Sequence, residues 1–465
     1  MLQAIEWLYG FIWGAPALLL ILGTGIWLSV KTRWAQFRLF PASVRDFFRT
    51  LTGRRKTADG VSSFQALCTA LAATVGIGNL AGVAGAITLG GPGAVFWMWM
   101  CAILGMMIKF AEVTLAVHFR TRDRQGDFIG GPMHMICRGL GKKWTWLAGM
   151  YSFFGVAAAF GVGNATQINA VVTGIHSAAA SFGGHVGKTG DLLIGIALAV
   201  LVGIVLWGGA QRIGRAAEKL IPFAAGGYVL LCVAVLLLRI SAIPSAFTAI
   251  LQGAFSPRAV TGGMIGSAMS ALRVGVSRGV FTNEAGMGTA SIAHASANVS
   301  HPAEQGKMGI MEVFLDTIVI CTLTALVILC SGVSIPYGTD SGAALTTLAF
   351  STVLGDWAGI VIALALCLFA FATVLGWGLY GARCAQFLFG QHVWRKFTLL
   401  QMAAVVLGAV MQTGTLWRLA EICNGLMALP NLTALLALSP VLIQIIQDYN
   451  PGRNSASGGT YENIH

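Results

Sequence analysis

Two glycine-interrupted apolar segments carry the residues whose types and spacing suit the binding of small polar ligands. The first runs from Ala70 to Gly82 and reads Ala-Leu-Ala-Ala-Thr-Val-Gly-Ile-Gly-Asn-Leu-Ala-Gly, with Gly76 and Gly78 followed directly by Asn79. Because glycine has no Cβ, a helix can unwind there at small steric cost. The N–H groups freed by unwinding can bind a carboxylate, and the freed carbonyls can bind a hard cation. The chemistry indicated is the capture of a zwitterion and a sodium ion.

The second segment runs from Arg278 to Gly288 and reads Arg-Gly-Val-Phe-Thr-Asn-Glu-Ala-Gly-Met-Gly. If the first apolar span is an addition, the two interrupted segments are the first and the sixth of ten remaining spans. They then hold corresponding places in two five-helix halves. Broken helices in such places are the best sequence indication of a transporter site built between structural repeats.

Other polar residues fall within apolar spans, where they are functional candidates by default. Gln167 follows Asn164 in one such span, and Thr373 and Trp377 lie four residues apart in another, with Gly376 between them. That spacing places Thr373 and Trp377 on one helix face. Thr373 has two possible roles, bonding its own helix or lining a site, and the spacing alone does not separate them.

Charged residues within the spans need partners. Lys109 and Glu112 lie three residues apart, so we expect them to pair on one helix face. Arg273 and Arg278 precede Glu284, and we interpret these charges as internal salt bridges or gate elements. Two further acidic residues have no role that the sequence assigns: Glu312 and Asp316.

No constellation for catalysis is present. The sequence contains no Ser/His/Asp or zinc-type pattern, and His176 and His294 are interpreted as local hydrogen-bonding residues. The nine cysteines form no C-x-x-C pair and are read as small core residues. We therefore expect neither an enzyme nor a cofactor.

The composition indicates the elements that position these residues. Of 465 residues, 56% are hydrophobic and only 10% are charged, against about 25% charged in soluble domains. Stretches of about 20 apolar residues cross a bilayer as helices, so the chain is predicted to be an all-α polytopic membrane protein. We expect eleven spans, at 9–30, 64–90, 93–117, 145–177, 191–208, 220–238, 262–298, 308–331, 355–382, 397–412 and 416–446, the last being one long helix interrupted at Pro430 or two short ones.

Basic residues indicate the orientation of the chain. Most lie in loops that share one side, notably at 31–56, 120–143 and 212–219. By the positive-inside rule these loops are cytoplasmic. The N-terminus is then outside and the C-terminus in the cytoplasm, with the chain in the cell (inner) membrane. Dispersed over loops, the net charge of +12 does not indicate nucleic-acid binding.

The chain is divided into one membrane domain with two halves. Residues 1–63 are expected to form an extra N-terminal helix and a basic cytoplasmic segment. The two five-helix repeats are placed at 64–240 and 241–448. The Gly/Ser-rich residues 449–465 are expected to be a disordered cytoplasmic tail.

Four long stretches strongly resemble the signature of the alanine or glycine:cation symporters. They are FQALCTALAATVGIGNLAGVAGAITLGGPGAVFWMWM (64–100), KFAEVTLAVHFR (109–120), GVFTNEAGMGTASIAHASA (279–297) and NGLMALPNLTALLALSP (424–440). The similarity covers the chain to about residue 448. It implies a LeuT-type fold of two inverted five-helix repeats, with one extra N-terminal helix here, that works by alternating access.

The same resemblance implies which residues form the site. The substrate carboxylate would bind backbone N–H groups at the first break, and the sodium ion would lie between the first and eighth core helices. The implied substrate-binding residues are Gly76, Ile77, Gly78, Asn79, Gln167, Phe281, Thr373, Gly376 and Trp377. The implied sodium ligands are the carbonyls of Ala72, Val75 and Phe369 and the hydroxyl of Thr373.

One residue departs from the family pattern, because Ala372 stands where relatives often have a hydroxyl residue. The implied function is inward symport of alanine or glycine with sodium as the coupling ion, with D-alanine or serine as further substrates. Proton coupling, a broader range including serine and glutamine, and an ion channel remain as alternatives. Membrane lipid is the expected surrounding partner, and the sequence does not set the oligomeric state.

Overall fold

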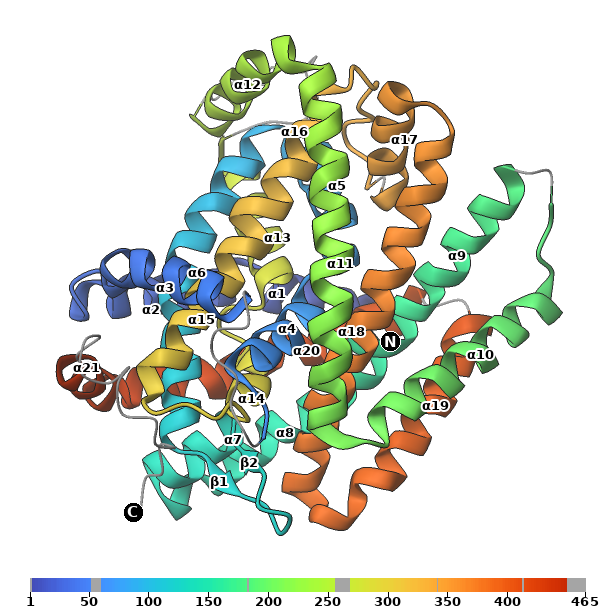
Figure 1. Cartoon of the computed structure of the whole chain (residues 1–465). Helices are drawn as coiled ribbons and strands as arrows, with labels where there is room; N and C mark the ends of the chain where they lie inside the picture. Colours follow the sequence, from blue (N-terminus) through green and yellow to red (C-terminus); the bar gives the residue numbers. More distant parts are fainter. Residues whose placement is uncertain are drawn as a thin grey trace.

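The computed structural model describes residues 2–51, 60–181, 184–255, 268–340, 342–411 and 414–449. Nearly all of these residues are helical, and a single short hairpin pairs β1 (Thr121–Arg122) with β2 (Phe128–Ile129). The predicted disordered tail lies, from residue 450 onward, outside the described residues. Helices α12 (Ile243–Phe255) and α17 (Gly342–Leu354) lie at the end of the molecule opposite to the hairpin (Figure 1).

The helices follow one another in three groups. The N-terminal group is α1 (Leu2–Ile12), α2 (Ala15–Lys31) and α3 (Ala35–Leu51). The second group is α4 (Ser63–Thr74), η1 (Gly78–Gly82), α5 (Val83–Gly90), α6 (Gly93–His118), α7 (Pro132–Met135), η2 (Ile136–Leu140), η3 (Lys142–Trp144), α8 (Thr145–Phe160), η4 (Gly161–Ala165), α9 (Thr166–Ser181), α10 (Lys188–Leu206), α11 (Gly209–Leu238) and η5 (Ile240–Ala242). After α12, the third group is α13 (Ala268–Asn283), α14 (Thr289–His294), α15 (Pro302–Val313), η6 (Phe314–Cys321), α16 (Thr322–Cys330), α17, α18 (Trp357–Phe389), η7 (Gln391–Val393), α19 (Trp394–Val410), α20 (Gly414–Ala437) and α21 (Ser439–Asp448).

Nine helices among the described residues are long and apolar enough to cross a membrane. A tenth span is added if α4 and the η1–α5 helix, bent by 53° at the first break, count as one. The predicted span at 262–298 is not one continuous helix, because α13 ends at Asn283 and α14 starts only at Thr289. Its first residues lie outside the described ranges. Pro430 does not interrupt the last span, since α20 runs through it to Ala437.

The first broken helix has a defined start and a defined end. Ser62 caps α4, because its hydroxyl accepts a hydrogen bond from the Gln65 N–H while the Gln65 side chain accepts one from the Ser62 N–H. Such reciprocal caps satisfy N–H groups that a helix start leaves unpaired. At the other end, Val75 has extended backbone angles (φ −76°, ψ 100°), so the α-helix stops at Thr74.

Helix α6 is largely buried and packs closely against α13 and α15 (Figure 1). Small residues permit this approach, as is usual where helices associate in lipid. A Cβ added at Gly279 would lie 3.1 Å from Cys101 Cβ, and one at Gly275 would meet the Ala94 carbonyl and come within 2.7 Å of Trp97 Cβ. The α6–α13 contact is therefore made by backbone against backbone.

The outer surface is apolar in the way that a lipid-facing surface requires. Phe223 and Leu230 on α11 are 73% and 72% exposed, and Leu364 on α18 is 60% exposed. In a soluble protein such side chains would be costly to expose. They are compatible with the hydrocarbon of a bilayer.

Replacing Gly275 by alanine is expected to destabilise the protein, because the new methyl group must displace the α6 backbone at Ala94. Overpacking of this kind costs about 1–3 kcal/mol. The measurement is the thermal unfolding temperature of the purified protein in detergent, and Gly149→Ala is the matched control, since nothing lies within 4 Å of that position. Equal unfolding temperatures for both variants would contradict the close packing.

Candidate functional site

The first break, between α4 and η1, exposes backbone groups that no other part of the described chain satisfies. Within the described residues, the N–H groups of Ile77 and Gly78 donate no hydrogen bond, and the carbonyls of Ala72 and Val75 accept none. Unpaired backbone groups at membrane depth are tolerated only where they face protein, water or a ligand. The break therefore presents donors for an anionic group and acceptors for a cation within a few residues.

Asn79 stabilises the break through its side chain. Its Oδ1 accepts a hydrogen bond from the Gly76 N–H at 2.8 Å, and its own N–H donates to the Gly76 carbonyl at 3.2 Å. Its Nδ2 donates to Asp316 Oδ1 at 2.7 Å and to the Asp316 carbonyl at 3.2 Å. Asn79 is thus occupied by protein partners and acts as a positioning residue.

Asp316 lies between the two broken helices, a role that the sequence did not reveal. Besides Asn79, its carboxylate accepts a hydrogen bond from the Thr317 hydroxyl at 2.8 Å. Thr317 in turn accepts one from the side chain of Asn283, the last residue of α13, at 3.3 Å. Asp316 is fully buried on the π-helical η6. One carboxylate therefore links the first break to the start of the second.

Helix α18 lies directly against the first break. A Cβ at Gly376 would lie 2.9 Å from the Ala73 N, and one at Gly76 would lie 2.9 Å from Thr373 Oγ1. The Thr373 hydroxyl donates to the Phe369 carbonyl at 3.0 Å, which settles the first of its two possible roles. A hydroxyl that donates once still has two lone pairs, so Thr373 Oγ1 remains able to coordinate a cation.

The residues implied as sodium ligands share one environment. Ala72, Val75 and Phe369 belong to a single buried cluster, and Ala372, next to Thr373, belongs to it as well. The Ala372 side chain is a methyl group, so this position offers no side-chain oxygen to an ion.

Phe281 on α13 closes the first break from the side of the second. Its ring carbon Cε1 would lie 3.7 Å from a Cβ at Gly78. Trp13 contacts the same ring edge-on, with centroids 6.2 Å apart. The structure thus brings Phe281 to Gly78 as the site assignment requires.

Trp377 and Gln167 contact η4 more directly than they contact the break. The Trp377 ring covers Gly163, where a Cβ would overlap it, and its Nε1 donates to Glu284 Oε1 at 3.2 Å. The Gln167 amide donates to the Val162 carbonyl at 3.0 Å, and its Oε1 has no partner among the described residues. No hydrogen bond in the described chain joins Gln167 to the first break.

The second break is held by carboxylates. Glu112 Oε1 accepts hydrogen bonds from the N–H groups of Gly286 (2.9 Å) and Gly288 (3.0 Å) and from Asn431 Nδ2 (2.7 Å). Glu284 has a left-handed backbone, with φ +52°, and its Oε2 accepts from the Thr289 hydroxyl at 2.6 Å. In the sequence, a carboxylate within an apolar span was the sign that could have pointed to Glu112 and Glu284. No comparable sign in the sequence pointed to Asn431.

The charged residues within the spans have one of their expected partners and lack another. Lys109 Nζ lies 4.0 Å from Glu112 Oε2, as its spacing predicts, and it lies closer to Glu312 Oε1, at 3.4 Å. Arg278 pairs with Asp340 at 2.8 Å and not with Glu284. The reason is that Arg278 lies between α5 and the residues that follow α16, away from the second break.

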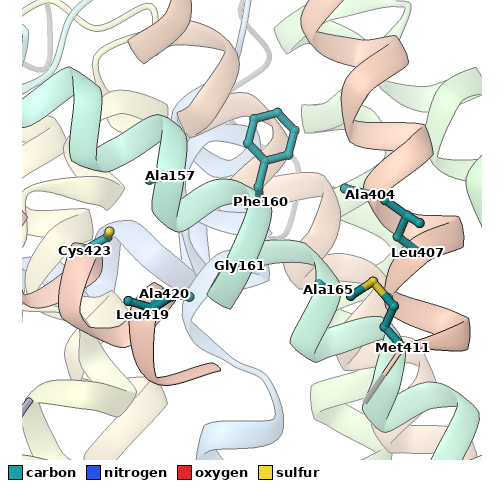
Figure 2. Close-up of a pocket in the computed structure, with 11 residues that line it drawn as sticks. Ala157, Phe160, Gly161, Ala165, Ala404, Leu407, Met411, Leu419, Ala420 and Cys423 are labelled. Carbon is teal, nitrogen blue, oxygen red and sulfur yellow. The ribbon is translucent and has the colours of Figure 1, made fainter. Parts of the chain in front are cut away.

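A separate cavity of about 290 Å³ lies between α8, η4, α19 and α20 (Figure 2). It contains none of the implied site residues. A zwitterion needs charged or hydrogen-bonding partners, and this lining offers almost none. The lining residues are Ala157, Phe160, Gly161, Ala165, Ala404, Leu407, Gly408, Met411, Leu419, Ala420 and Cys423.

Comparisons with known proteins show which family and which fold the chain resembles. Residues 1–462 match the model of the sodium:alanine symporter family. The chain is 40% identical to a sodium/alanine symporter, AgcS, of Methanococcus maripaludis, with 96% of each chain covered. It is 35% identical to a probable sodium/glutamine symporter, GlnT, of Bacillus subtilis, over 97% of this chain and 91% of that one.

A solved structure matches the fold. The crystal structure of MhsT in complex with L-phenylalanine superposes with a TM-score of 0.57 at 14% identity, covering 84% of this chain and 99% of that one. This likeness shows the LeuT-type architecture, as the sequence resemblance implied, and at such low identity it shows the fold alone.

Replacing Trp377 by phenylalanine is expected to destabilise the protein, because Glu284 Oε1 loses its donor while the ring remains packed on Gly163. Leaving a buried acceptor unpaired costs about 1–3 kcal/mol. The check is thermal unfolding in detergent beside Trp207→Phe, whose side chain is 48% exposed. A Trp377 variant as stable as the control would show that the Glu284 contact contributes nothing.

Proposed function

We propose that this chain, which belongs to the sodium:alanine symporter family, imports a small neutral amino acid together with sodium by alternating access. Membership establishes a multi-pass membrane transporter of the symporter class rather than an enzyme. The choice of amino acid and of coupling ion is our proposal.

The observation that carries the proposal is the set of free backbone groups at the first break. The N–H groups of Ile77 and Gly78 have no partner within the described chain and lie at the start of the η1–α5 helix, whose partial positive end favours an anion. We assign them to the substrate carboxylate. The Asn79 side chain keeps this turn open through Gly76 and Asp316.

The coupling ion is assigned to the opposite side of the same turn. The carbonyls of Ala72 and Val75 are free within the described residues, and the Phe369 carbonyl and Thr373 hydroxyl lie on the adjacent α18. All four are oxygen atoms that can coordinate a cation, and hard cations prefer oxygen ligands. With Ala372 in place of a hydroxyl, we expect weak sodium binding, and a proton remains the alternative coupling ion.

The size of the site favours a small substrate. Phe281 packs beside Gly78, and α18 meets α4 at Gly376 with no room for a side chain. Trp377 covers the neighbouring η4 segment, where Gln167 offers an unpartnered amide oxygen for the substrate ammonium. We therefore propose L-alanine and glycine as substrates, with D-alanine or serine as further ones. The relative named as a probable glutamine symporter supports a broader neutral range as the second candidate.

The topology is proposed together with the function. We place the chain in the cell (inner) membrane, with the N-terminus outside and the C-terminus in the cytoplasm, because basic loops favour the cytoplasmic side. The two five-helix halves are assigned to 64–240 and 241–448, so that each contains one of the two broken helices.

The function is tested by transport in proteoliposomes. Labelled alanine should exchange with internal alanine, and net uptake should follow an inward sodium gradient. Protein-free liposomes define the background, and an ionophore that collapses the sodium gradient is the control for gradient-driven uptake. Absence of alanine exchange, or alanine uptake indifferent to both sodium and proton gradients, would falsify the symporter proposal. Ion conduction without alanine exchange would favour a channel.

The variants Asn79→Ala and Thr373→Ala are expected to abolish uptake without loss of folded protein. The first removes the acceptor of the Gly76 N–H and the Asn79 donor to Asp316 Oδ1, and the second removes a proposed sodium ligand. Loss of one such buried interaction corresponds to about a tenfold or greater effect. Uptake at saturating alanine is the measurement.

The matched control for this pair is Thr433→Ala, which removes an exposed Thr that makes the same kind of bond to its own helix. Uptake near wild-type level in both site variants would rule out the site assignment. Loss of uptake in the control as well would show that the assay reports only helix damage.

The variant Ala372→Ser is expected to lower the sodium concentration needed for half-maximal uptake. It restores an oxygen beside Thr373 in the buried cluster that holds Ala72 and Val75. One added interaction of about 0.5–1.5 kcal/mol gives about a two- to tenfold change. The control is Ala382→Ser, equally buried on α18 but away from the break, and an unchanged sodium dependence in Ala372→Ser would remove the assigned ion position.

A further inference from the structure

We propose that Lys109, Glu112 and Glu312, here named the Lys109 cluster, form a binding site for one exchangeable proton beside the second break. This goes beyond the proposed function, which assigns the substrate and coupling ion to the first break. Only the consequence for transport depends on the proposed function. The site itself depends on contacts between α6 and α15.

The geometry of the cluster is that of one ammonium between two carboxylates. Lys109 Nζ lies 3.4 Å from Glu312 Oε1 and 4.0 Å from Glu112 Oε2, and the three side chains are at most 1% exposed. Lys109 Nζ and Glu312 Oε1 are thus paired by charge, whereas Glu112 Oε2, the more distant oxygen, accepts no hydrogen bond in the described chain. A buried carboxylate oxygen without a donor is costly, so Glu112 Oε2 is a free acceptor beside an ammonium that already pairs with Glu312.

The neighbouring histidine adds no positive charge. The Gln305 side chain accepts from the Ser63 hydroxyl at 2.6 Å, and its Nε2 lies within reach of the Ser63 carbonyl, at 3.3 Å, and of His294 Nδ1, at 2.7 Å. Since the amide nitrogen is a donor, His294 Nδ1 must accept. His294 Nε2–H then donates to Glu312 Oε2 at 3.0 Å, which makes His294 a neutral imidazole.

The remaining titratable groups that face the cluster increase its negative charge or leave it unchanged. Glu284 and Asp316 bind only neutral hydrogen-bond donors in the described chain. Lys307, toward the start of α15, is paired with Asp46 of α3. The nearby phenols, on α8 and α18, belong to Tyr151 and Tyr380, and both hydroxyls lack partners among the described residues.

The charge balance selects a proton as the ligand. Two carboxylates around one ammonium leave a net charge of −1 in a dry interior, and one added proton makes the cluster neutral. A metal ion is disfavoured, because it would have to share the two carboxylate oxygens with the Lys109 ammonium at 3.4 Å and 4.0 Å. A proton from solvent on a carboxylate oxygen meets no such repulsion.

The proton would control how firmly α6 holds the second break. Glu112 presents its other oxygen, Oε1, to the N–H groups of Gly286 and Gly288 and to Asn431. The buried arrangement described here binds the proton more tightly than a hydrated one, so by linkage the proton stabilises this arrangement. Opening the break toward water releases the proton, and raising the pH favours opening.

The first experiment needs no substrate. Thermal unfolding of the wild type, Glu312→Gln and the control Glu218→Gln is measured in detergent from about pH 5.5 to about pH 8.5. Glu218 is a partly buried carboxylate that binds Gln65 outside the cluster. Because the unfolded chain does not hold this proton in that range, the wild type and the control should lose stability as the pH rises, by about 2 °C or more. Glu312→Gln, neutral without a proton, should lose less.

Glu112→Gln provides a second removal of charge, in case Glu312→Gln does not fold. Identical pH profiles for the wild type and either folded cluster variant overturn the proposal. A stabilisation of the wild type by sodium that is lost in Glu312→Gln overturns it too, because the ligand would then be a metal ion.

The second experiment measures protons directly. Calorimetry of alanine binding in buffers of different ionisation enthalpy gives the number of protons exchanged per alanine bound. We expect a fraction of a proton for the wild type and Glu218→Gln, and none for Glu312→Gln. If alanine binds with no proton exchange in the wild type, the coupling of the cluster to the site is wrong while the proposed function stands. If alanine does not bind, the proposed function fails, and the substrate-free comparison still decides whether the cluster holds a proton.

Discussion

The structure depends on one constraint, which is that backbone N–H and carbonyl groups at membrane depth must be satisfied. Nearly every helix meets it internally. The first break does not, since Ile77, Gly78, Ala72 and Val75 leave backbone groups open within the described residues. The close approach of Gly376 and the side-chain amide of Asn79 support this turn but do not hydrogen-bond to its free backbone groups. A turn kept open at such a place is the physical basis of the proposed symport.

The second break satisfies the same constraint by different means. There the free N–H groups of Gly286 and Gly288 are taken by a carboxylate of the protein itself, Glu112. The two breaks are joined through Asp316, which reaches Asn79 directly and Asn283 through Thr317. One break is thus open to an external ligand and the other is closed by an internal one.

The extent to which the sequence predicts this arrangement follows from what kind of interaction is involved. Apolar length and glycine spacing are local properties, so the spans and the break at Gly76–Gly78 could be recognised. The interruption of the span at 262–298 was likewise predicted from its glycines, but hydrophobicity does not report the left-handed backbone angles of Glu284, Gly286 and Gly288 that form it. Partners distant in sequence were beyond reach. Arg278 pairs with Asp340, and Glu112 contacts Asn431, across 62 and 319 positions.

The turn at Val75–Gly76 has a thermodynamic consequence for the two proposed ligands. The carbonyl of Val75 and the N–H of Gly76 belong to a single peptide unit, which is polarised as a whole through its partial double bond. A cation bound to that carbonyl makes the Gly76 N–H a stronger donor to Asn79 Oδ1, which strengthens the turn that presents the Ile77 and Gly78 N–H groups. The bound amino acid would raise the affinity for the ion by the same factor, since the coupling free energy between two bound species is symmetric. Cooperativity between ion and amino acid would then need no distant relay, because both ligands would act on the same few peptide planes.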